Sequence, residues 1–323
     1  MATTLSKRST TLTPSASDLP ERRRPPLASL KRMTPFYLMI LPGLLFFLLF
    51  KYVPMLGVVI AFQNYNPFQG FQGSEWVGLQ HFRELFQERD FLVLLRNTLW
   101  LNLLDLLLFF PIPIVLAVML GELRSRRMSA LIQTVMYAPH FLSWVVIVGV
   151  TFVLFSAQSG GVNQLLQAAG LPRLEVLTDP AAFRWVWLLQ NIWQGSGWSA
   201  ILFLAALASI NPTLYEASRI DGAGRLRQIW HISLPGLKQL IVILFILRLG
   251  HFMDLGFEHI LLLQNPLNMS TSDVFDTFVY RKGIVRGDFS YTTAVGLFKS
   301  LVGLLLVVMS NKLAARSGQE GVI

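Results

Sequence analysis

Long runs of apolar residues, separated by polar segments, dominate the pattern of this chain. A helix needs roughly 20 mostly apolar residues to cross a bilayer, and six stretches meet that length. We therefore predict an all-α membrane protein whose membrane domain covers residues 33–316. The six predicted spans are residues 36–62, 97–120, 130–155, 183–208, 238–263 and 291–310.

The polar segments between these spans carry positive charge unevenly. If the first residue lies in the cytoplasm, the segments on that side hold 16 Lys and Arg residues and those on the opposite side hold 8. Cytoplasmic loops of membrane proteins are enriched in Lys and Arg. The count therefore predicts that both ends are cytoplasmic: a basic, disordered tail at residues 1–32, rich in Ser, Thr and Pro, and a short tail at 317–323.

The composition of the chain changes the picture by what it excludes. Hydrophobic residues make up 53% of the 323 residues and charged residues only 14%, where soluble domains average about 25% charged. The absence of cysteine excludes disulfides, thiolate metal sites and a catalytic thiol. The net charge of +9 is explained mostly by cytoplasmic Lys and Arg, so it gives no reason to expect a nucleic-acid partner.

Catalytic and nucleotide-binding motifs are missing from the sequence. It contains neither the G-x-x-x-x-G-K-[ST] loop that cradles phosphates nor the H-E-x-x-H zinc motif. His251 and His259 are eight residues apart, but no third ligand accompanies them, so we expect no metal site. We also expect this chain to bind no cofactor of its own.

The most informative polar segment is the loop at residues 209–238. Pro212 favours the start of a helix, Glu216 suits its first turn, and Gly222 can end it. A second short helical stretch is expected at 225–232. The loop would then project as a helix, turn, helix unit whose exposed side chains fit a groove of a soluble partner. Those exposed side chains are Tyr215, Ala217, Arg219 and Ile220.

Several predicted spans contain ionisable or polar side chains, which must be paired or hydrated at such depth and so should face the bundle interior. Arg248, His251 and Asp254 follow at intervals of three and would share one helix face. Aromatic rings stack on sugars, and amide or charged groups bond hydroxyls. The aromatic, amide and charged side chains of these spans together therefore suit a carbohydrate path. Internal pairing, for instance of Arg248 with Asp105 or Asp254, explains these side chains equally well. The candidate path residues are Asn191, Trp193, Gln194, Trp198, Arg248, His251, Asp254 and Lys299.

The loop at 209–238 also carries a family signature, the pattern E-A-A-x-x-x-G-(nine residues)-I-x-L-P. The matching residues are Glu216, Ala217, Gly222, Ile232, Leu234 and Pro235, with Ser218 where the family usually has Ala. Through this pattern the chain resembles the permease subunits of bacterial ATP-binding-cassette (ABC) importers. Further likeness to the polysaccharide and oligosaccharide branch comes from Tyr52-Val-Pro-Met, Asn97-Thr98, Tyr280-Arg281 and the stretch from Gly287 to Lys299. Within that branch the chain resembles the importers of alginate oligosaccharide.

The resemblance implies the fold of type I importer permeases, with six transmembrane helices in a bacterial inner membrane. It implies partners: a second homologous permease, two cytoplasmic ATPase subunits that hold ATP and Mg²⁺, and an extracytoplasmic sugar-binding protein. The chain would be a conduit for oligo- or polysaccharide, including acidic, alginate-like sugar, and not an enzyme. The loop would be the coupling helix that docks into an ATPase, with Tyr215, Glu216, Ala217, Arg219, Asp221 and Gly222 at the contact.

Three alternatives stay open from the residues themselves. The loop at 209–238 would merely link two spans and cap its own helices. A membrane-embedded enzyme that modifies glycan or lipid would use Asp105, Asp254 and Glu258 as acid and base, and would turn over without an ATPase. A permease for a non-sugar solute such as a peptide would share the spans and the loop but not the substrate.

Overall fold

The computed structural model describes the backbone of residues 27–316 and the side chains of residues 33–316. The described part is mostly helical and belongs to two units, Met1–Gly57 and Val58–Ile323, which we treat separately. The predicted tail at 317–323 lies outside the described residues. So does most of the predicted tail at 1–32, although helix α1 already begins at Leu27.

The first unit is a helical run with apolar side chains. Its elements are α1 (Leu27–Phe47), η2 (Leu48–Tyr52), α2 (Val53–Met55) and the start of η3 (Leu56–Phe62). Pro42, Lys51 and Pro54 lie within the predicted first span: Pro42 is inside α1, Lys51 is in η2, and the helix widens to π geometry at η2 just before Pro54. Every side chain from 33 to 56 is exposed in the described structure, which suits a helix surrounded by lipid.

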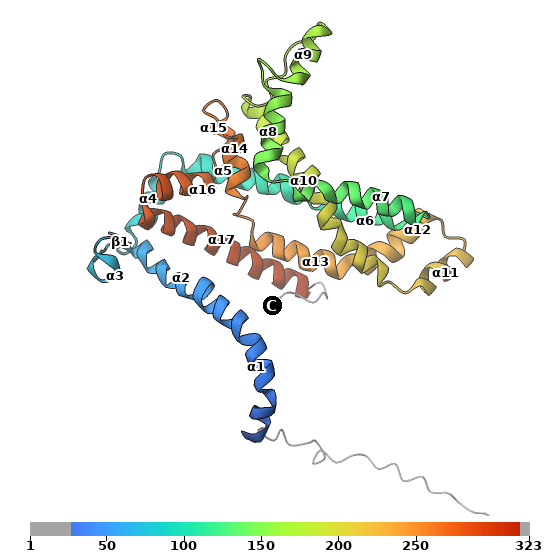
Figure 1. The fold of residues 1–323 in the computed structure, drawn as a ribbon, viewed down its shortest axis with the longest axis horizontal. Coiled ribbons are helices and arrows are strands. Elements are labelled where there is room, and N and C mark those ends of the chain that lie inside the picture. The colour runs from blue at the N-terminus through green and yellow to red at the C-terminus, as the bar shows by residue number, and fades with distance from the viewer. Residues whose placement is uncertain (1–26, 317–323) are drawn as a thin grey trace, which may run out of the picture. The chain divides into compact units, whose positions relative to one another are not determined.

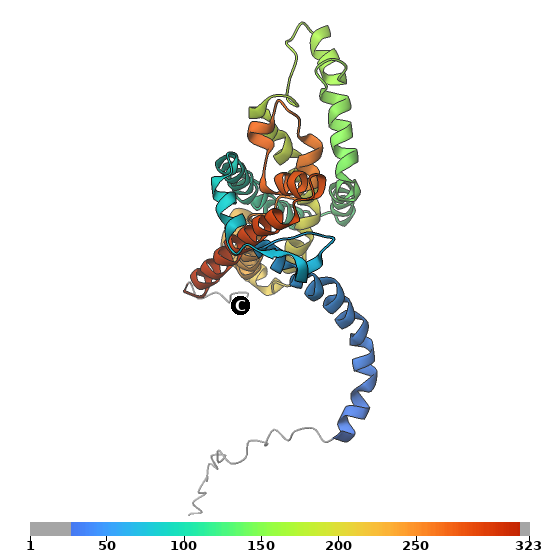
Figure 2. The same cartoon turned by 90° about the vertical axis from the view of Figure 1, so that its left-hand side faces the viewer.

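The second unit holds the remaining helices and one short hairpin (Figures 1 and 2). Its helices before α10 are α3 (Gly70–Gly73), α4 (Gln80–Gln87), α5 (Phe91–Leu104), η4 (Asp105–Phe109), α6 (Pro111–Gly121), α7 (Arg126–Tyr137), η5 (Ala138–Phe141), α8 (Trp144–Phe155) and α9 (Gly161–Ala168). The others are α10 (Pro180–Ala208), α11 (Pro212–Ile220), α12 (Arg225–Gln228), η6 (Ile229–Ser233), α13 (Leu234–Gly250), α14 (Phe257–Leu263), α15 (Met269–Ser272), α16 (Phe275–Val279), η7 (Tyr280–Val285) and α17 (Phe289–Arg316). Strands β1 (Gln63–Asn64) and β2 (Glu75–Trp76) pair antiparallel.

Helices long and apolar enough to cross a membrane recur along the described residues. Four qualify alone, and the number rises to six if each of two sharply bent helix pairs counts as one span. The four are Met33–Phe62, Phe91–Gly121, Arg225–Gly250 and Phe289–Arg316, and the pairs are Arg126–Phe141 with Trp144–Phe155 and Pro180–Ala208 with Pro212–Ile220. The first pair bends by 96° just after Pro139, and α8 then leads away from α13 and α17 to α9 in both views (Figures 1 and 2).

The end of the predicted fifth span differs from the structure. Helix α13 ends at Gly250, a turn occupies 251–256, and only then does α14 begin. The ending coincides with a close approach of α17, because a Cβ added to Gly303 would lie 2.6 Å from the Gly250 carbonyl oxygen. The turn itself is anchored, since Met253 is buried in the bundle.

The start of the same helix also differs from the prediction. Instead of a separate short helix at 225–232, helical structure runs unbroken from Arg225 to Gly250. The wide π turn η6 precedes Pro235, which has no backbone N–H to donate, and the helix continues past it. The second half of the predicted helix, turn, helix unit is therefore the extended end of α13.

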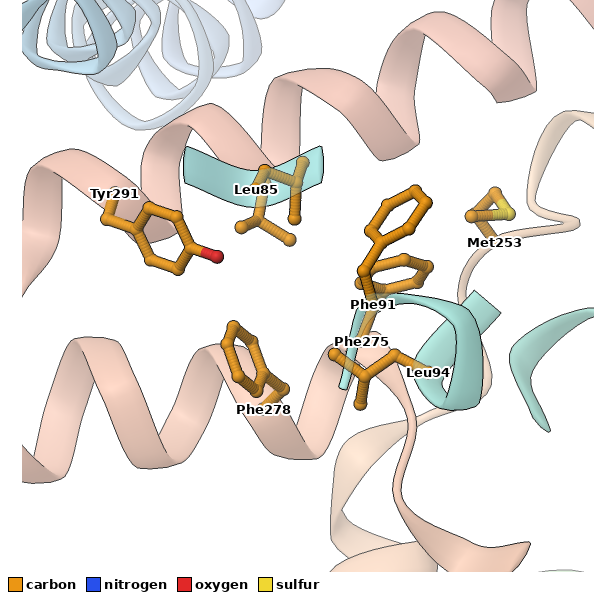
Figure 3. Packing of buried hydrophobic residues seen from close by; sticks show 8 residues of the cluster. Leu85, Phe91, Leu94, Met253, Phe275, Phe278 and Tyr291 are labelled. Carbon is orange, nitrogen blue, oxygen red and sulfur yellow. The ribbon is translucent and has the colours of Figure 1, made fainter. Parts of the chain in front are cut away.

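Three apolar clusters hold the second unit together. The first joins α4, α5, α16 and α17 with the turn after α13, and Figure 3 shows Met253 and Phe91 side by side with the ring of Phe275. A second cluster centres on Trp187 of α10 and includes Ile260 of α14. A third joins α6, α10 and α13 around Ala117 and Leu237. Helix α10 contributes to two clusters, so it is the central support of this unit.

Candidate functional site

Helix α11 begins where the sequence predicts it. The Asn211 side chain accepts a hydrogen bond from the backbone N–H of Thr213 at 3.0 Å and so caps the helix. Pro212 occupies the first helical position, where a backbone N–H would have no partner inside the helix. The predicted start at the Asn211-Pro212 pair is confirmed.

The predicted end of α11 is confirmed as well, and its cause is a left-handed glycine. Gly222 has φ +76°, a conformation that strains any residue with a side chain. The Ala223 N–H donates to the carbonyl of Ser218 at 2.8 Å, and the Gly222 N–H donates to that of Arg219 at 3.1 Å. Gly222 therefore makes the turn that reverses the chain into α12.

Side chains behind α11 tie it to the helix that follows. The buried Gln228 donates from Nε2 to Ser218 Oγ at 2.8 Å and to the carbonyl of Tyr215 at 3.4 Å. The hydroxyls of Tyr215 and Ser233 share a hydrogen bond of 3.0 Å. Ser218, the departure from the family pattern, thus has a bonding role that Ala would lack. Sequence analysis missed Gln228, whose only signal is an amide between Leu226 and Ile229.

The opposite face of α11 is open. Glu216, Ala217, Arg219 and Asp221 are all exposed, and within residues 33–316 none of these charges enters an ion pair. Ile220 is 87% exposed beside them. The described α11 is thus a short helix braced from behind, with apolar and charged groups pointing out, the combination that protein-contact surfaces use.

A cavity of about 960 Å³ lies beside this helix. Its wall includes the turn at the end of α6, where Glu122 lies 3.9 Å from Arg225 of α12. The wall residues that belong to α11 are Pro212, Tyr215, Glu216 and Arg219. Residues of α12 and η6 line the cavity too, so the open space lies beside the hydrogen bonds that join α11 to these elements.

The first intramembrane charge is paired inside the bundle. Arg248, near the end of α13, donates from Nε to Asp105 Oδ2 at 2.7 Å, and its Nη2 contacts the same oxygen. Asp105 is buried in η4, and the Arg248 guanidinium carbon lies 5.5 Å from the centre of the Phe109 ring. The Arg248 side chain remains 46% exposed. This is one of the ion pairs that the pairing interpretation named.

The second intramembrane charge joins three elements. Lys299 of α17 lies 2.7 Å from Asp254 in the turn after α13 and also contacts Asp276 of α16. Asp276 in turn accepts the backbone N–H of Leu255 at 3.0 Å. The Lys299 side chain is 10% exposed and Asp254 is 58% exposed. Lys299 thus fastens the turn at 251–256 to the bundle.

The predicted helix face of Arg248, His251 and Asp254 does not form. Because α13 ends at Gly250, His251 is the residue just after the helix and Asp254 lies in the turn. Arg248 and Asp254 consequently have different partners, Asp105 and Lys299. A spacing of three residues places side chains on one face only where the chain is helical, and the helix ends before His251.

Three of the predicted path residues meet around one cavity. Trp198, Arg248 and His251 line a cavity of about 540 Å³ whose other walls are mainly Phe, Leu and Ile side chains of η4, α10 and α13. The Trp198 ring is stacked on His140 with centres 4.5 Å apart and planes 5° apart, which fixes its orientation. An oriented aromatic face beside a half-exposed guanidinium is a surface suited to an anionic sugar.

The other predicted path residues lie outside this cavity. Asn191, Trp193 and Gln194 belong to α10, and Gln194 donates to the carbonyl of His140 at 3.4 Å. Glu258 is exposed in the first turn of α14. The three carboxylates proposed for an enzyme thus sit in η4, the turn after α13 and α14, and two of them are ion-paired.

Sequence analysis missed the acidic partners on and beside α16. Asp276 holds Lys299, and Asp273 accepts two hydrogen bonds from the guanidinium of Arg281, at 2.8 and 2.6 Å. The hydrogen bonds to Asp273 raise the pKa of Arg281 above its ordinary value. Both acids fall in a segment predicted as an outer loop, where charges need no explanation, so nothing in the sequence singled them out. Among the described residues, no group of three His, Cys, Asp or Glu side chains is placed to hold a metal ion.

The chain is similar to known transport proteins of bacteria. Residues 110–318 match the family described as binding-protein-dependent transport system inner membrane component. The chain is 51% identical over 302 residues to the polygalacturonan/rhamnogalacturonan transport system permease protein YteP of Bacillus subtilis (strain 168), covering 94% of each chain. It is 49% identical over 295 residues to protein LplB of the same organism, covering 91% of this chain and 93% of LplB.

A solved structure extends the likeness to three dimensions. A chain from the crystal structure of a bacterial alginate ABC transporter in complex with alginate pentasaccharide-bound periplasmic protein has a TM-score of 0.83 and 39% identity. The match covers 91% of this chain and 99% of that one. The chain described here therefore belongs to the binding-protein-dependent transport system inner membrane components and is a multi-pass permease of the sugar ABC importer class.

Proposed function

We propose that this chain is one of two permease subunits of an inner-membrane importer for acidic oligo- or polysaccharide. It crosses the membrane six times with both ends in the cytoplasm, as the distribution of Lys and Arg predicts. An extracytoplasmic binding protein delivers the sugar, and two cytoplasmic ATPases bind ATP and Mg²⁺ and supply the energy. Support comes from the family match and from the alginate transporter solved together with its periplasmic protein.

The observation that carries the proposal is the build of α11. Its outward face presents Glu216, Ala217 and Arg219 to solvent, while Gln228 and Ser233 hold its inner face to α12 and η6. Because its inner face is bonded to α12 and η6, a movement of α11 is transmitted through these elements to α13. We assign it as the coupling helix of an ATPase, with Tyr215, Asp221 and Gly222 completing the contact.

ATPase closure would then move α11 and, through α12 and η6, the long helix α13. That helix runs unbroken from Arg225 to Gly250, where Arg248 meets Asp105 of η4. A displacement of the Arg225 end of this helix therefore also moves the ion pair and the cavity at its Gly250 end. Switching between inward-open and outward-open states by such rigid-body movement is a familiar mode of conformational change.

The sugar path is proposed along the cavity lined by Trp198, Arg248 and His251. The 46% exposure of Arg248 leaves part of its guanidinium available to a carboxylate even though Asp105 is bound. The choice of an acidic sugar is supported by the structurally similar bacterial transporter, which is involved in the import of the acidic polysaccharide alginate. The remaining predicted path residues, Asn191, Trp193, Gln194, Asp254 and Lys299, stay predictions.

The test uses the complex purified from native membranes by a tag on this chain. We expect an ATPase pair, a second permease and ATP hydrolysis that rises when the binding protein is loaded with an acidic oligosaccharide but not with a neutral one. Glu216→Ala should reduce the amount of copurified ATPase. The matched control Glu175→Ala removes an exposed carboxylate from the segment between α9 and α10 and should leave the ATPase bound. Absence of any ATPase, or hydrolysis indifferent to sugar, would overturn the proposal.

A further inference from the structure

Two arginines of the second unit lack an acidic partner. Arg96 of α5 and Arg184 of α10 form no ion pair with any carboxylate of residues 33–316, and the Arg184 guanidinium lies against the ring of Trp100, one helical turn after Arg96 on α5. Helix α15 lies against both of their helices: Arg96 donates to the carbonyl of Ser270 at 2.9 Å, and Thr271 donates to the carbonyl of Pro180 at 2.8 Å. The fold thus brings two like charges onto neighbouring helices, and neither has a carboxylate at ion-pair distance among these residues.

The guanidinium of Arg184 also has an unused donor. Its Nε is buried and makes no hydrogen bond in the described structure, while its central carbon lies 5.8 Å from the centre of the Trp100 ring. Buried donors are almost always bonded, so an orphan of this kind needs an explanation. The buried Nε is closed to solvent, so an anion beside Arg96 and Arg184 would bond the other N–H groups of the two guanidiniums.

The depth of the pair indicates which anion is within reach. The helical run Phe91–Gly121 has 31 residues and α10 has 29, so at 1.5 Å per residue both are about 45 Å long. That length matches a bilayer including its headgroup regions, about 40–45 Å. Arg96 and Arg184 lie within about 7 Å of the ends at which their helices begin. They therefore sit at the depth of lipid headgroups, at the opposite end of α10 from α11.

The surface next to the pair is apolar and continues toward the middle of the helix. Trp100 is 45% exposed, and it is followed by Leu103 of α5 and Leu107 of η4, both exposed. Tryptophan concentrates at the boundary between headgroups and hydrocarbon, and exposed leucines below it suit an acyl chain. An oligosaccharide would find no hydroxyl or carbonyl partner on these three side chains.

We propose that Arg96 and Arg184 bind the phosphate of a membrane phospholipid, with one acyl chain lying along Trp100, Leu103 and Leu107. The phosphate oxygens accept from the terminal N–H groups of both guanidiniums that have no other acceptor. The bound lipid joins α5, α10 and α15 at the end of the bundle where the two like charges lie on neighbouring helices. This site is distinct from the sugar cavity and stands whether or not the proposed substrate is correct.

The first experiment needs no variant. The complex, purified by the tagged chain and stripped of lipid in mild detergent, is titrated in native mass spectrometry with a phospholipid, with diacylglycerol and with glycerol phosphate. Phospholipid should bind about tenfold more tightly than either of the others, because only it offers both the phosphate and the chains. Equally tight binding of diacylglycerol, which has no phosphate, would contradict recognition of the headgroup. Binding of glycerol phosphate as tight as phospholipid would reduce the site to one for free phosphate esters.

Variants locate the site. Arg184→Gln and Arg96→Gln should each weaken retention of one phospholipid about tenfold. The control Arg286→Gln removes an exposed arginine just before α17 and should change nothing. If the Gln variants do not assemble, Arg184→Lys keeps the charge but loses the guanidinium and should weaken binding by a smaller factor. Displacement of the lipid by an acidic oligosaccharide, or unchanged lipid retention in assembled Arg96 and Arg184 variants, would overturn the proposal.

Discussion

The helix α11 and the ion pair region around Lys299 handle charge in opposite ways. On α11, Glu216, Arg219 and Asp221 point outward and have no ion-pair partner within residues 33–316. At Lys299, two carboxylates from separate elements surround one ammonium group that is 10% exposed. Exposed charge costs little to leave unpaired, whereas buried charge must be matched. The first arrangement suits contact with a partner protein and the second suits support of the fold.

The comparison distinguishes two roles of a polar residue in a membrane protein, contact with a ligand or partner and internal pairing that supports the fold. Sequence analysis assigned Lys299 and Arg248 to a sugar path and to internal pairing with equal weight. The structure gives both a carboxylate partner, but Arg248 stays half-exposed beside a cavity while Lys299 does not line it. The two residues are therefore expected to differ when they are replaced, and two predictions test that difference, while a third tests α11.

The largest effect is expected at Lys299. Lys299→Met leaves the carboxylate of Asp276, which is only 17% exposed, without its cation, and loss of one partner of a buried pair costs about 3–5 kcal/mol of stability. We expect the complex to unfold at clearly lower temperature, measured by thermal denaturation in detergent. Lys312→Met, which replaces an exposed lysine of the same helix, is the control and should unfold as the native complex does. A stable Lys299→Met complex that no longer imports sugar would instead place Lys299 on the path.

An intermediate effect is expected at the Arg248 pair. Asp105→Asn removes the charge that the Arg248 guanidinium binds and should cost about 1–3 kcal/mol, because Arg248 is half-exposed and water replaces part of the interaction. A double-mutant cycle with Arg248→Gln measures the coupling between them. In transport assays Arg248→Gln should lower uptake of acidic sugar more than of neutral sugar. Equal loss for both sugars would assign Arg248 to stability alone.

The smallest effects are expected behind α11. Gln228→Ala removes the hydrogen bond to Ser218 and should free α11 locally at a cost of about 1 kcal/mol. Hydrogen exchange of residues 212–220 should accelerate, and fewer ATPase subunits should copurify. Ser218→Ala, which restores the family residue, removes the acceptor of the same bond and should have a similar or smaller effect. If both variants bind ATPase as before with unchanged exchange, the brace is not needed for coupling.

Helix α11 shows what local sequence is able to predict. Asn211 with Pro212 starts the helix and Gly222 ends it, because caps and left-handed turns depend on neighbouring residues. The long apolar runs likewise predicted helices of membrane-crossing length, since a bilayer imposes that length on any spanning segment. The family signature in the loop then led to the same family that the comparisons show.

The sequence alone therefore determined the apolar helices, the loop that joins α10 to α12 and the family. Only the tertiary structure decided where α13 ends, because the limit at Gly250 coincides with the close approach of Gly303 from α17. It also decided which carboxylates hold Arg248 and Lys299, since Asp105 is 143 residues from Arg248 along the chain and Asp276 is 23 residues from Lys299. Local rules fix caps and helix length, whereas a buried charge takes its partner from whichever element the packing brings beside it.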